Sequence, residues 1–200
     1  MSTKEDGVAT LGVDSPLARD GLPTKPFNAL DPSQSVVRSL MSQPRARVWL
    51  CGPAGTGKSK VVSALCEACA MAGLEMQVCA STGQAASQFA EYGGRTLHSW
   101  AGLSVSGAGK DPRRVAYGVA SRRQEEFQRV QVLVLDEISM LPRWPLEVLD
   151  FAMRRARSST RPFGGCRILA VGDFMQLAPV ERSDGPSVPH TLLSHPDLFA

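Results

Sequence analysis

The sequence predicts an α/β fold in which helices flank a parallel β-sheet. Three observations carry this prediction. Four short apolar runs alternate with segments of helical periodicity, and such segments join parallel strands by right-handed crossovers. The first apolar run leads into a glycine-rich loop and then a helix. The chain has 200 residues, of which 43% are hydrophobic and 20% charged, so it can bury one core of ordinary domain size.

The expected strands are short, mainly apolar runs bounded by glycines or charged residues. They cover residues 48–51, 76–80, 130–135 and 167–171. Proline and glycine mark the helix ends, because Pro32 and Pro145 suit a first helical turn and Gly73 suits a helix stop. The expected helices cover residues 32–43, 58–71, 84–92 and 145–157.

The chain divides into a tail and a domain. Residues 1–26 mix Gly, Pro, Asp and Ser without a sustained period, which predicts a disordered tail. Residues 27–200 form the predicted domain. Within it, residues 103–125 are expected to be an insertion, because the stretch 102–118 is rich in glycine, serine and basic residues and has no clear periodicity.

Basic residues concentrate in two segments of that domain. The formal net charge is +3, but residues 110–129 hold six basic residues against three acids, and residues 143–167 hold six against two. Such a surface suits a polyanion such as nucleic acid. Charged runs are also often no more than solvated faces, so charge alone leaves both interpretations open.

The remaining composition bears on the cell compartment. No run reaches the roughly 18 apolar residues of a membrane span, so we expect no membrane partner. The first 34 residues hold five acids and three bases, unlike a transit peptide, which favours an intracellular protein of the nucleus over one of the mitochondrion. The five cysteines indicate free thiols in a reducing compartment, and we interpret Cys66 and Cys69 as core residues rather than a zinc or redox pair.

Residues 52–59 carry the clearest chemical motif, a glycine loop of the pattern G-x4-G-K-[ST]. The motif lies where its mechanism requires, after an expected strand and at the start of a helix. Its backbone N–H groups can converge on phosphate oxygens, the lysine can reach the β and γ phosphates, and the serine hydroxyl can bind Mg²⁺. The predicted ATP-binding residues are Gly52, Pro53, Ala54, Gly55, Thr56, Gly57, Lys58 and Ser59.

A second motif places two carboxylates at the exit of the most strand-like run, in Val-Leu-Val-Leu-Asp136-Glu137. In an enzyme with a phosphate-binding loop, an Asp at this point ligates Mg²⁺, usually through water. A neighbouring Glu can orient and deprotonate the attacking water. The pattern therefore predicts Ser59 and Asp136 as metal ligands and Glu137 as the general base.

Three further clusters have no such simple mechanism on their own: residues 80–86 (ASTGQAA), 96–102 (TLHSWAG) and 171–180 (VGDFMQLAPV). Together with Asp136-Glu137 and the Pro-Phe-Gly-Gly at 162–165, their order and spacing resemble the first helicase domain of superfamily-one helicases. The resemblance is to the Pif-one (petite integration frequency) family, with the bacterial RecD-like enzymes next, and it runs from about residue 27 to the end.

The resemblance implies a RecA-like P-loop NTPase fold with a small basic insertion subdomain beside the DNA fork. It implies an ATP-dependent DNA helicase of 5′-to-3′ polarity, with ATP and Mg²⁺ as cofactors and single-stranded DNA and DNA forks as partners. ATP hydrolysis would be coupled to translocation along the single strand, in DNA repair, recombination and telomere maintenance. We expect the chain to be monomeric.

The resemblance also implies roles for single residues. Gln34 would contact the adenine base, and Gln176 would sense the γ-phosphate with support from Asp173; Ala178 departs from the proline usual there. We interpret Trp100 as a core residue. The implied catalytic residues are Lys58, Glu137 and Gln176. The implied DNA-binding residues are Thr82, Gly83, Thr96, His98 and Ser99.

The sequence departs from the family pattern in length. A second RecA-like domain, which would supply arginine fingers, is absent, so we expect a fragment or truncated form that binds nucleotide far better than it hydrolyses it. The alternative is a nucleotide- or DNA-binding module without unwinding activity, which the complete set of catalytic residues disfavours. An unrelated P-loop kinase or ATPase is disfavoured by the clusters at 96–102 and 172–180.

Overall fold

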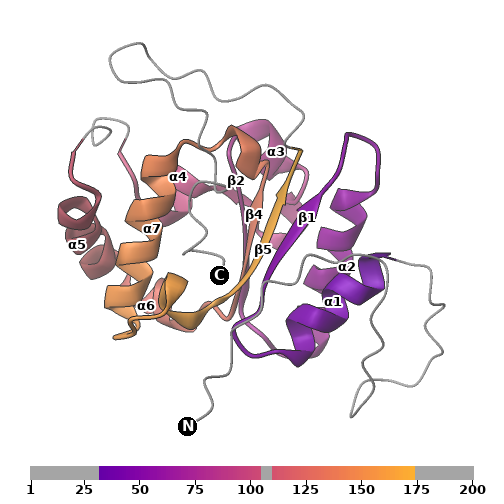
Figure 1. Ribbon diagram of the computed structural model, residues 1–200, viewed down its shortest axis with the longest axis horizontal. Helices are drawn as coiled ribbons and strands as arrows, with labels where there is room; N and C mark the ends of the chain where they lie inside the picture. Colours follow the sequence, from indigo (N-terminus) through magenta and orange to yellow (C-terminus); the bar gives the residue numbers. More distant parts are fainter. Residues whose placement is uncertain (1–31, 105–109, 174–200) are drawn as a thin grey trace, which may run out of the picture.

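A five-stranded parallel sheet forms the centre of the protein (Figure 1). The computed structural model describes residues 32–104 and 110–173. The strands lie in the order β1 (Arg47–Cys51), β5 (Arg167–Gly172), β4 (Val132–Asp136), β2 (Met76–Ala80) and β3 (Arg95–Thr96). Each pair of neighbours is parallel, which confirms the predicted fold class. Within the described part of the chain, no helix is both long and apolar enough to cross a membrane.

Helices cover both faces of the sheet (Figure 1). On one face lie α1 (Pro32–Ser42) and α2 (Lys58–Met71), and on the other lie α4 (Leu97–Ala101), α5 (Pro112–Arg122), α6 (Gln124–Arg129) and α7 (Arg143–Ala156). Successive residues of β4 serve opposite faces: Val134 packs with α1 and α2, whereas Leu135 packs with α7. Because both faces are buried, this strand is apolar throughout until its final residue, Asp136.

The strand ends align at one edge of the sheet. Cys51 of β1 pairs with Gly172 of β5, and Ala80 of β2 pairs with both Asp136 of β4 and Thr96 of β3. The loops that follow these strands therefore start side by side. The carboxyl edge of a parallel sheet is where such folds bind ligands.

Two short elements after β2 differ from the prediction of one helix over residues 84–92. The structure has α3 (Gly83–Ser87) and then the 3₁₀ helix η1 (Ala90–Tyr92). The buried Phe89 lies between them with φ −114° and ψ 25°, and it packs into the core with α2. This core contact interrupts the helix. The two-residue strand β3, which follows, is too short to produce a periodic signal and was not predicted.

Part of the stretch expected to be an insertion without clear periodicity is regular, because residues from 112 on form the helix α5, which the sequence analysis did not predict. Asp111 accepts a hydrogen bond from the Arg113 N–H and caps α5, which then packs along α7. The residues of α5 that make this contact are Ala116, Val119 and Ala120. Because they are small and lie among basic residues, the sequence shows no clear apolar stripe for this helix. Because these residues share one buried cluster with α7, the described part of the insertion packs into the main domain.

Three further differences are small. The sequence analysis did not predict α6, which forms directly after α5. Helix α7 begins at Arg143, two residues before the predicted proline start. The 3₁₀ helices η3 (Ile138–Met140) and η4 (Pro162–Gly165) connect β4 to α7 and α7 to β5.

The interpretations of the cysteine pair and of Trp100 agree with the structure. Cys66 and Cys69 are buried on α2, and burial raises the pKa of their thiols to about 12 and about 11. Both thiols are therefore protonated at neutral pH. Trp100 is buried and meets Phe127 edge to face at 5.2 Å between ring centroids. The predicted tail, residues 1–26, lies outside the described residues.

Candidate functional site

The loop between β1 and α2 has the backbone that its glycines predict. Gly55 and Gly57 have φ angles of 82° and 88°, in the left-handed region that residues with side chains rarely adopt. A Cβ added at Gly52 would lie 2.9 Å from the Thr56 hydroxyl oxygen. That hydroxyl donates a hydrogen bond to the Pro53 carbonyl at 2.9 Å, which closes the loop. Three positions of the loop therefore require glycine.

Lys58, the first residue of α2, folds over this loop. Its ammonium donates hydrogen bonds to the carbonyl oxygens of Gly52 and Pro53 at 2.5 and 2.8 Å. Ser59 is the next residue and is exposed. The helix N-terminus adds positive potential at the same place, so a cation, a hydroxyl and a helix dipole converge beside the glycine loop.

Asp136 ends β4 and is 9% exposed. Burial raises the pKa of its carboxyl to about 6, and the Glu137 carboxylate adds to the rise, while the Glu137 N–H and the Lys58 ammonium oppose it. A bound divalent cation would favour the ionised form. The hydroxyl of Ser59 and this carboxylate are oxygen donors of the kind that Mg²⁺ takes, and Mg²⁺ fills its other positions with water and phosphate oxygens.

Glu137 follows directly and is held by the neighbouring strand end. Its backbone is left-handed, with φ 51°. Its side-chain oxygen Oε2 accepts hydrogen bonds from the Ser81 hydroxyl at 3.1 Å and from the Thr82 hydroxyl at 3.3 Å. The β2–β4 register, which pairs Ala80 with Asp136, brings these residues together. The structure thus connects the predicted base to a segment predicted to bind DNA.

Two threonines cap short helices at the same edge of the sheet. The Thr82 hydroxyl accepts the N–H of Ala85 at 3.2 Å and caps α3. The Thr96 hydroxyl accepts the N–H of Ser99 at 3.2 Å and caps α4. Because β2 and β3 are adjacent and parallel, the two capped segments lie next to each other. Gly83 is exposed at the start of α3.

His98 and Ser99 lie on α4, beyond Thr96. His98 is half-buried, and burial lowers the pKa of its imidazole, which favours the neutral, hydrogen-bonding form. Ser99 is exposed, and its carbonyl oxygen accepts hydrogen bonds from the guanidinium groups of Arg95 at 3.2 Å and Arg123 at 3.4 Å. These two arginines add positive charge beside the second capped segment.

The structure does not describe the side chains of two predicted site residues. Gln176 lies outside the described residues, as does Ala178, and Gln34 lies in the first turn of α1 with its side chain outside the description. Their roles stay predictions. Asp173, the predicted support for Gln176, is buried directly after β5, 7% exposed.

The sequence analysis gave no role to Ser81, although the structure puts its hydroxyl on Glu137. The one available signal was its position, directly after a buried strand that runs beside the Asp-Glu strand. That neighbour relation depends on strand order, which the sequence pattern does not reveal.

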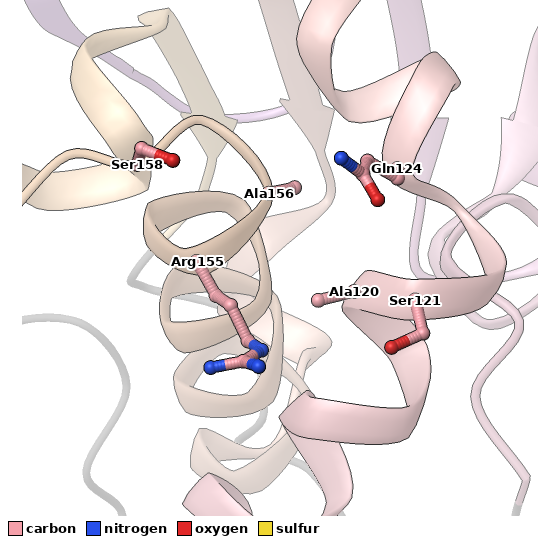
Figure 2. Close-up of a pocket in the computed structure, with 6 residues that line it drawn as sticks. All are labelled: Ala120, Ser121, Gln124, Arg155, Ala156 and Ser158. Carbon is pink, nitrogen blue, oxygen red and sulfur yellow. The ribbon is translucent and has the colours of Figure 1, made fainter.

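A cavity of about 310 Å³ lies away from this site (Figure 2). It is lined by Ala120, Ser121, Gln124, Arg155, Ala156 and Ser158. These residues are at the end of α5, the start of α6 and the end of α7, which lead into the amino ends of β4 and β5. The cavity is therefore at the edge of the sheet opposite the glycine loop, and it contributes nothing to the site.

A parallel sheet with a glycine loop after β1 and an Asp-Glu pair at the end of β4 defines the class of RecA-like P-loop nucleoside triphosphatases. The comparisons with known proteins narrow the class. A profile described as "PIF1-like helicase" matches residues 32–193, so the chain belongs to the PIF1-like helicase family. The resemblance drawn from the sequence motifs is confirmed.

Characterised relatives share about a third of their residues with this chain. The ATP-dependent DNA helicase Pif1 of Bdellovibrio bacteriovorus is 37% identical over 154 residues, which cover 77% of this chain and 34% of that protein. The ATP-dependent DNA helicase PIF1 of Homo sapiens is 32% identical over 173 residues, which cover 86% of this chain and 25% of that protein. The chain thus spans about a third or less of the length of these relatives.

Solved structures agree on the fold. The Pif1 helicase from Candida albicans matches with a TM-score of 0.63 at 32% identity, covering 76% of this chain and 34% of that one. The Pif1 helicase from Bacteroides, in complex with ADP-AlF3 and single-stranded DNA, matches with a TM-score of 0.62 at 26% identity, covering 83% and 36%.

Proposed function

We propose that the chain is the first motor domain of an ATP-dependent DNA helicase that moves 5′ to 3′ along single-stranded DNA. One observation carries the proposal: the phosphate loop, the Asp-Glu pair and the two threonine-capped segments lie along one edge of one sheet. The nucleotide site and the binding site for a second ligand would then be held by the same sheet. The names of the relatives, ATP-dependent DNA helicases, support the same assignment.

In this proposal the loop residues 52–57 hold the phosphates and Gln34 contacts the base. Lys58 leaves its loop carbonyls to pair with the β and γ phosphates, as a charge-assisted contact. Ser59 and Asp136 hold Mg²⁺, which supplies charge neutralisation on the phosphate oxygens.

Glu137 takes the proton of the attacking water as general base. Gln176 senses the γ-phosphate. Arginine fingers come from a second RecA-like domain in the full-length protein. Such a finger raises the rate of ATP hydrolysis about 10³- to 10⁵-fold. Without it, the first motor domain, residues 27–200, binds nucleotide but hydrolyses it slowly.

The second ligand is single-stranded DNA. The exposed Thr82 and Gly83 and the segment of Thr96, His98 and Ser99 would contact its backbone, since hydroxyls and neutral donors suit phosphate oxygens without reading sequence. Solved relatives support this substrate class: one is the Bacteroides Pif1 bound to single-stranded DNA, and another is described as the structural basis for DNA unwinding at forked double-stranded DNA by two coordinating Pif1 helicases. We further propose that the protein is monomeric and intracellular, nuclear rather than mitochondrial, and acts in DNA repair, recombination and telomere maintenance.

Glu137→Gln in the full-length protein tests the assignment. The amide keeps the size of the side chain and removes the proton acceptor, so ATP still binds while hydrolysis stimulated by single-stranded DNA falls at least 100-fold, the usual contribution of a general base. Glu67→Gln is the matched control, because Glu67 is an exposed carboxylate on the outer surface of α2. Wild-type hydrolysis by the Glu137 variant would refute the assigned base.

A further inference from the structure

Ser81 and Thr82 converge on one atom of Glu137. Both hydroxyls donate to Oε2, at 3.1 and 3.3 Å, and both residues come directly after β2. The backbone of Glu137 is fixed in a left-handed turn, since its carbonyl accepts the N–H of Met140 at 2.9 Å in η3. With the backbone fixed, these two hydrogen bonds decide which way the carboxylate points.

Thr82 serves a second structure at the same time. Its oxygen accepts the N–H of Ala85 and so caps α3, while its single hydroxyl proton goes to Glu137. A hydroxyl has one proton, so Thr82 can donate either to Glu137 or to another acceptor. Thr82 is exposed, and an oxygen of a DNA phosphate that arrived there would compete for that proton.

Losing that donor changes what Glu137 can do. A general base must lie about 2.6 to 3.2 Å from the water it deprotonates. A carboxylate oxygen that accepts two hydroxyl hydrogen bonds is drawn toward β2 and has fewer lone pairs left for water. With one donor gone, the side chain regains rotational freedom and acceptor capacity.

We propose that Ser81 and Thr82 restrain Glu137, and that a backbone phosphate of single-stranded DNA relaxes the restraint by taking the Thr82 hydroxyl. Ser81 is then a positioning residue that keeps hydrolysis slow while the DNA site is empty. This inference rests on the proposed function, because it needs Glu137 as the base and the Thr82 segment as the DNA contact.

The test compares ATP hydrolysis with and without single-stranded DNA in the full-length protein. Ser81→Ala removes one of the two hydrogen bonds, so the DNA-free rate rises about 2- to 10-fold, the worth of one such bond. The DNA-saturated rate stays within twofold of wild type, so stimulation by DNA shrinks. Nucleotide affinity is unchanged.

Two further variants bracket this one. Ser87→Ala is the matched control, because the exposed Ser87 donates only to the Gln84 carbonyl within α3. It keeps wild-type stimulation. Thr82→Val removes the second hydroxyl at nearly constant volume and raises the DNA-free rate in the same direction, whereas Thr82→Ser keeps the hydroxyl and keeps stimulation near wild type.

The outcomes separate this inference from the function on which it rests. If Ser81→Ala leaves the stimulation ratio unchanged, or lowers both rates equally, the restraint is refuted even though Glu137→Gln abolishes turnover. If Glu137→Gln itself turns over at the wild-type rate, the proposed base has failed instead.

Discussion

Replacing Lys58 with alanine should weaken binding of Mg-ADP to this chain by about 10- to 30-fold. The Lys58 ammonium lies on the phosphate loop, where it contacts two carbonyl oxygens. A hydrogen bond to a charged group contributes about 1.5 to 3 kcal/mol. Each 1.4 kcal/mol is tenfold in affinity, which sets a range of about 10- to 150-fold.

The structure places the expected value in the lower part of this range. In the structure the Lys58 ammonium donates to two carbonyl oxygens, of Gly52 and Pro53, and it must give up those contacts to reach a phosphate. The net gain is therefore smaller than the gross energy of the new contact. The Pro53 carbonyl is exposed and the Gly52 carbonyl is part-buried, so in the alanine variant water can reach at least one of them and the cost to the fold is small.

Titration calorimetry on residues 1–200 measures the effect directly. Lys60→Ala is the control, since Lys60 is exposed two residues further along α2 and its side chain makes no hydrogen bond or ion pair with the described residues. The control should bind Mg-ADP within twofold of wild type. Equal affinities for the Lys58 variant and wild type, or equal losses in both variants, would refute the reasoning.

Three other predictions follow from the structure. Arg113 and Arg114 are exposed cations of α5. Replacing both with glutamine should make the slope of log K against log salt concentration, for binding to single-stranded DNA, shallower by about 1.4. An unchanged slope, measured by fluorescence anisotropy, would contradict this prediction. The pKa of the Asp136 carboxyl is raised to about 6 in the native state, against about 3.8 in the unfolded chain. Between these pH values the native state binds more protons than the unfolded state. The metal-free chain should therefore lose stability as the pH rises from about 4 to 6. Urea titrations should show this loss in wild type and a smaller one in Asp136→Asn. Gly94→Ala should destabilise the domain by about 1 to 3 kcal/mol, because the new Cβ would lie 2.6 and 2.8 Å from two backbone carbonyl oxygens, whereas Gly83→Ala has open space and should not lower the melting temperature.

The parts of the fold that were predictable have a strong local pattern. The run from Val132 to Leu135 is apolar because both sheet faces are covered, and the loop before Lys58 needs glycines for its backbone angles. Such signals lie within a few adjacent residues. They were enough to locate the glycine loop and the carboxylate pair, whereas the family resemblance came from the order and spacing of several such motifs along the chain.

The parts that were missed depend on contacts between distant residues. Helix α5 is stabilised by small residues such as Ala116 and Val119, which pack against α7. Its sequence has no local apolar stripe that would predict the helix. The bond from Ser81 to Glu137 depends on β2 lying beside β4, although 56 positions separate the two residues. Strand order is a property of the whole sheet, so a reading of one segment at a time cannot supply it.

Directional unwinding tests the central claim most directly. Duplexes with only a 5′ or only a 3′ single-stranded tail would be offered to the full-length protein with Mg-ATP, and in parallel to its Lys58→Ala variant. The account predicts strand separation of the 5′-tailed duplex, none of the 3′-tailed duplex, and none of either by the variant. A wild-type protein that binds ATP and single-stranded DNA yet separates neither duplex would contradict the account and favour a binding module without motor activity.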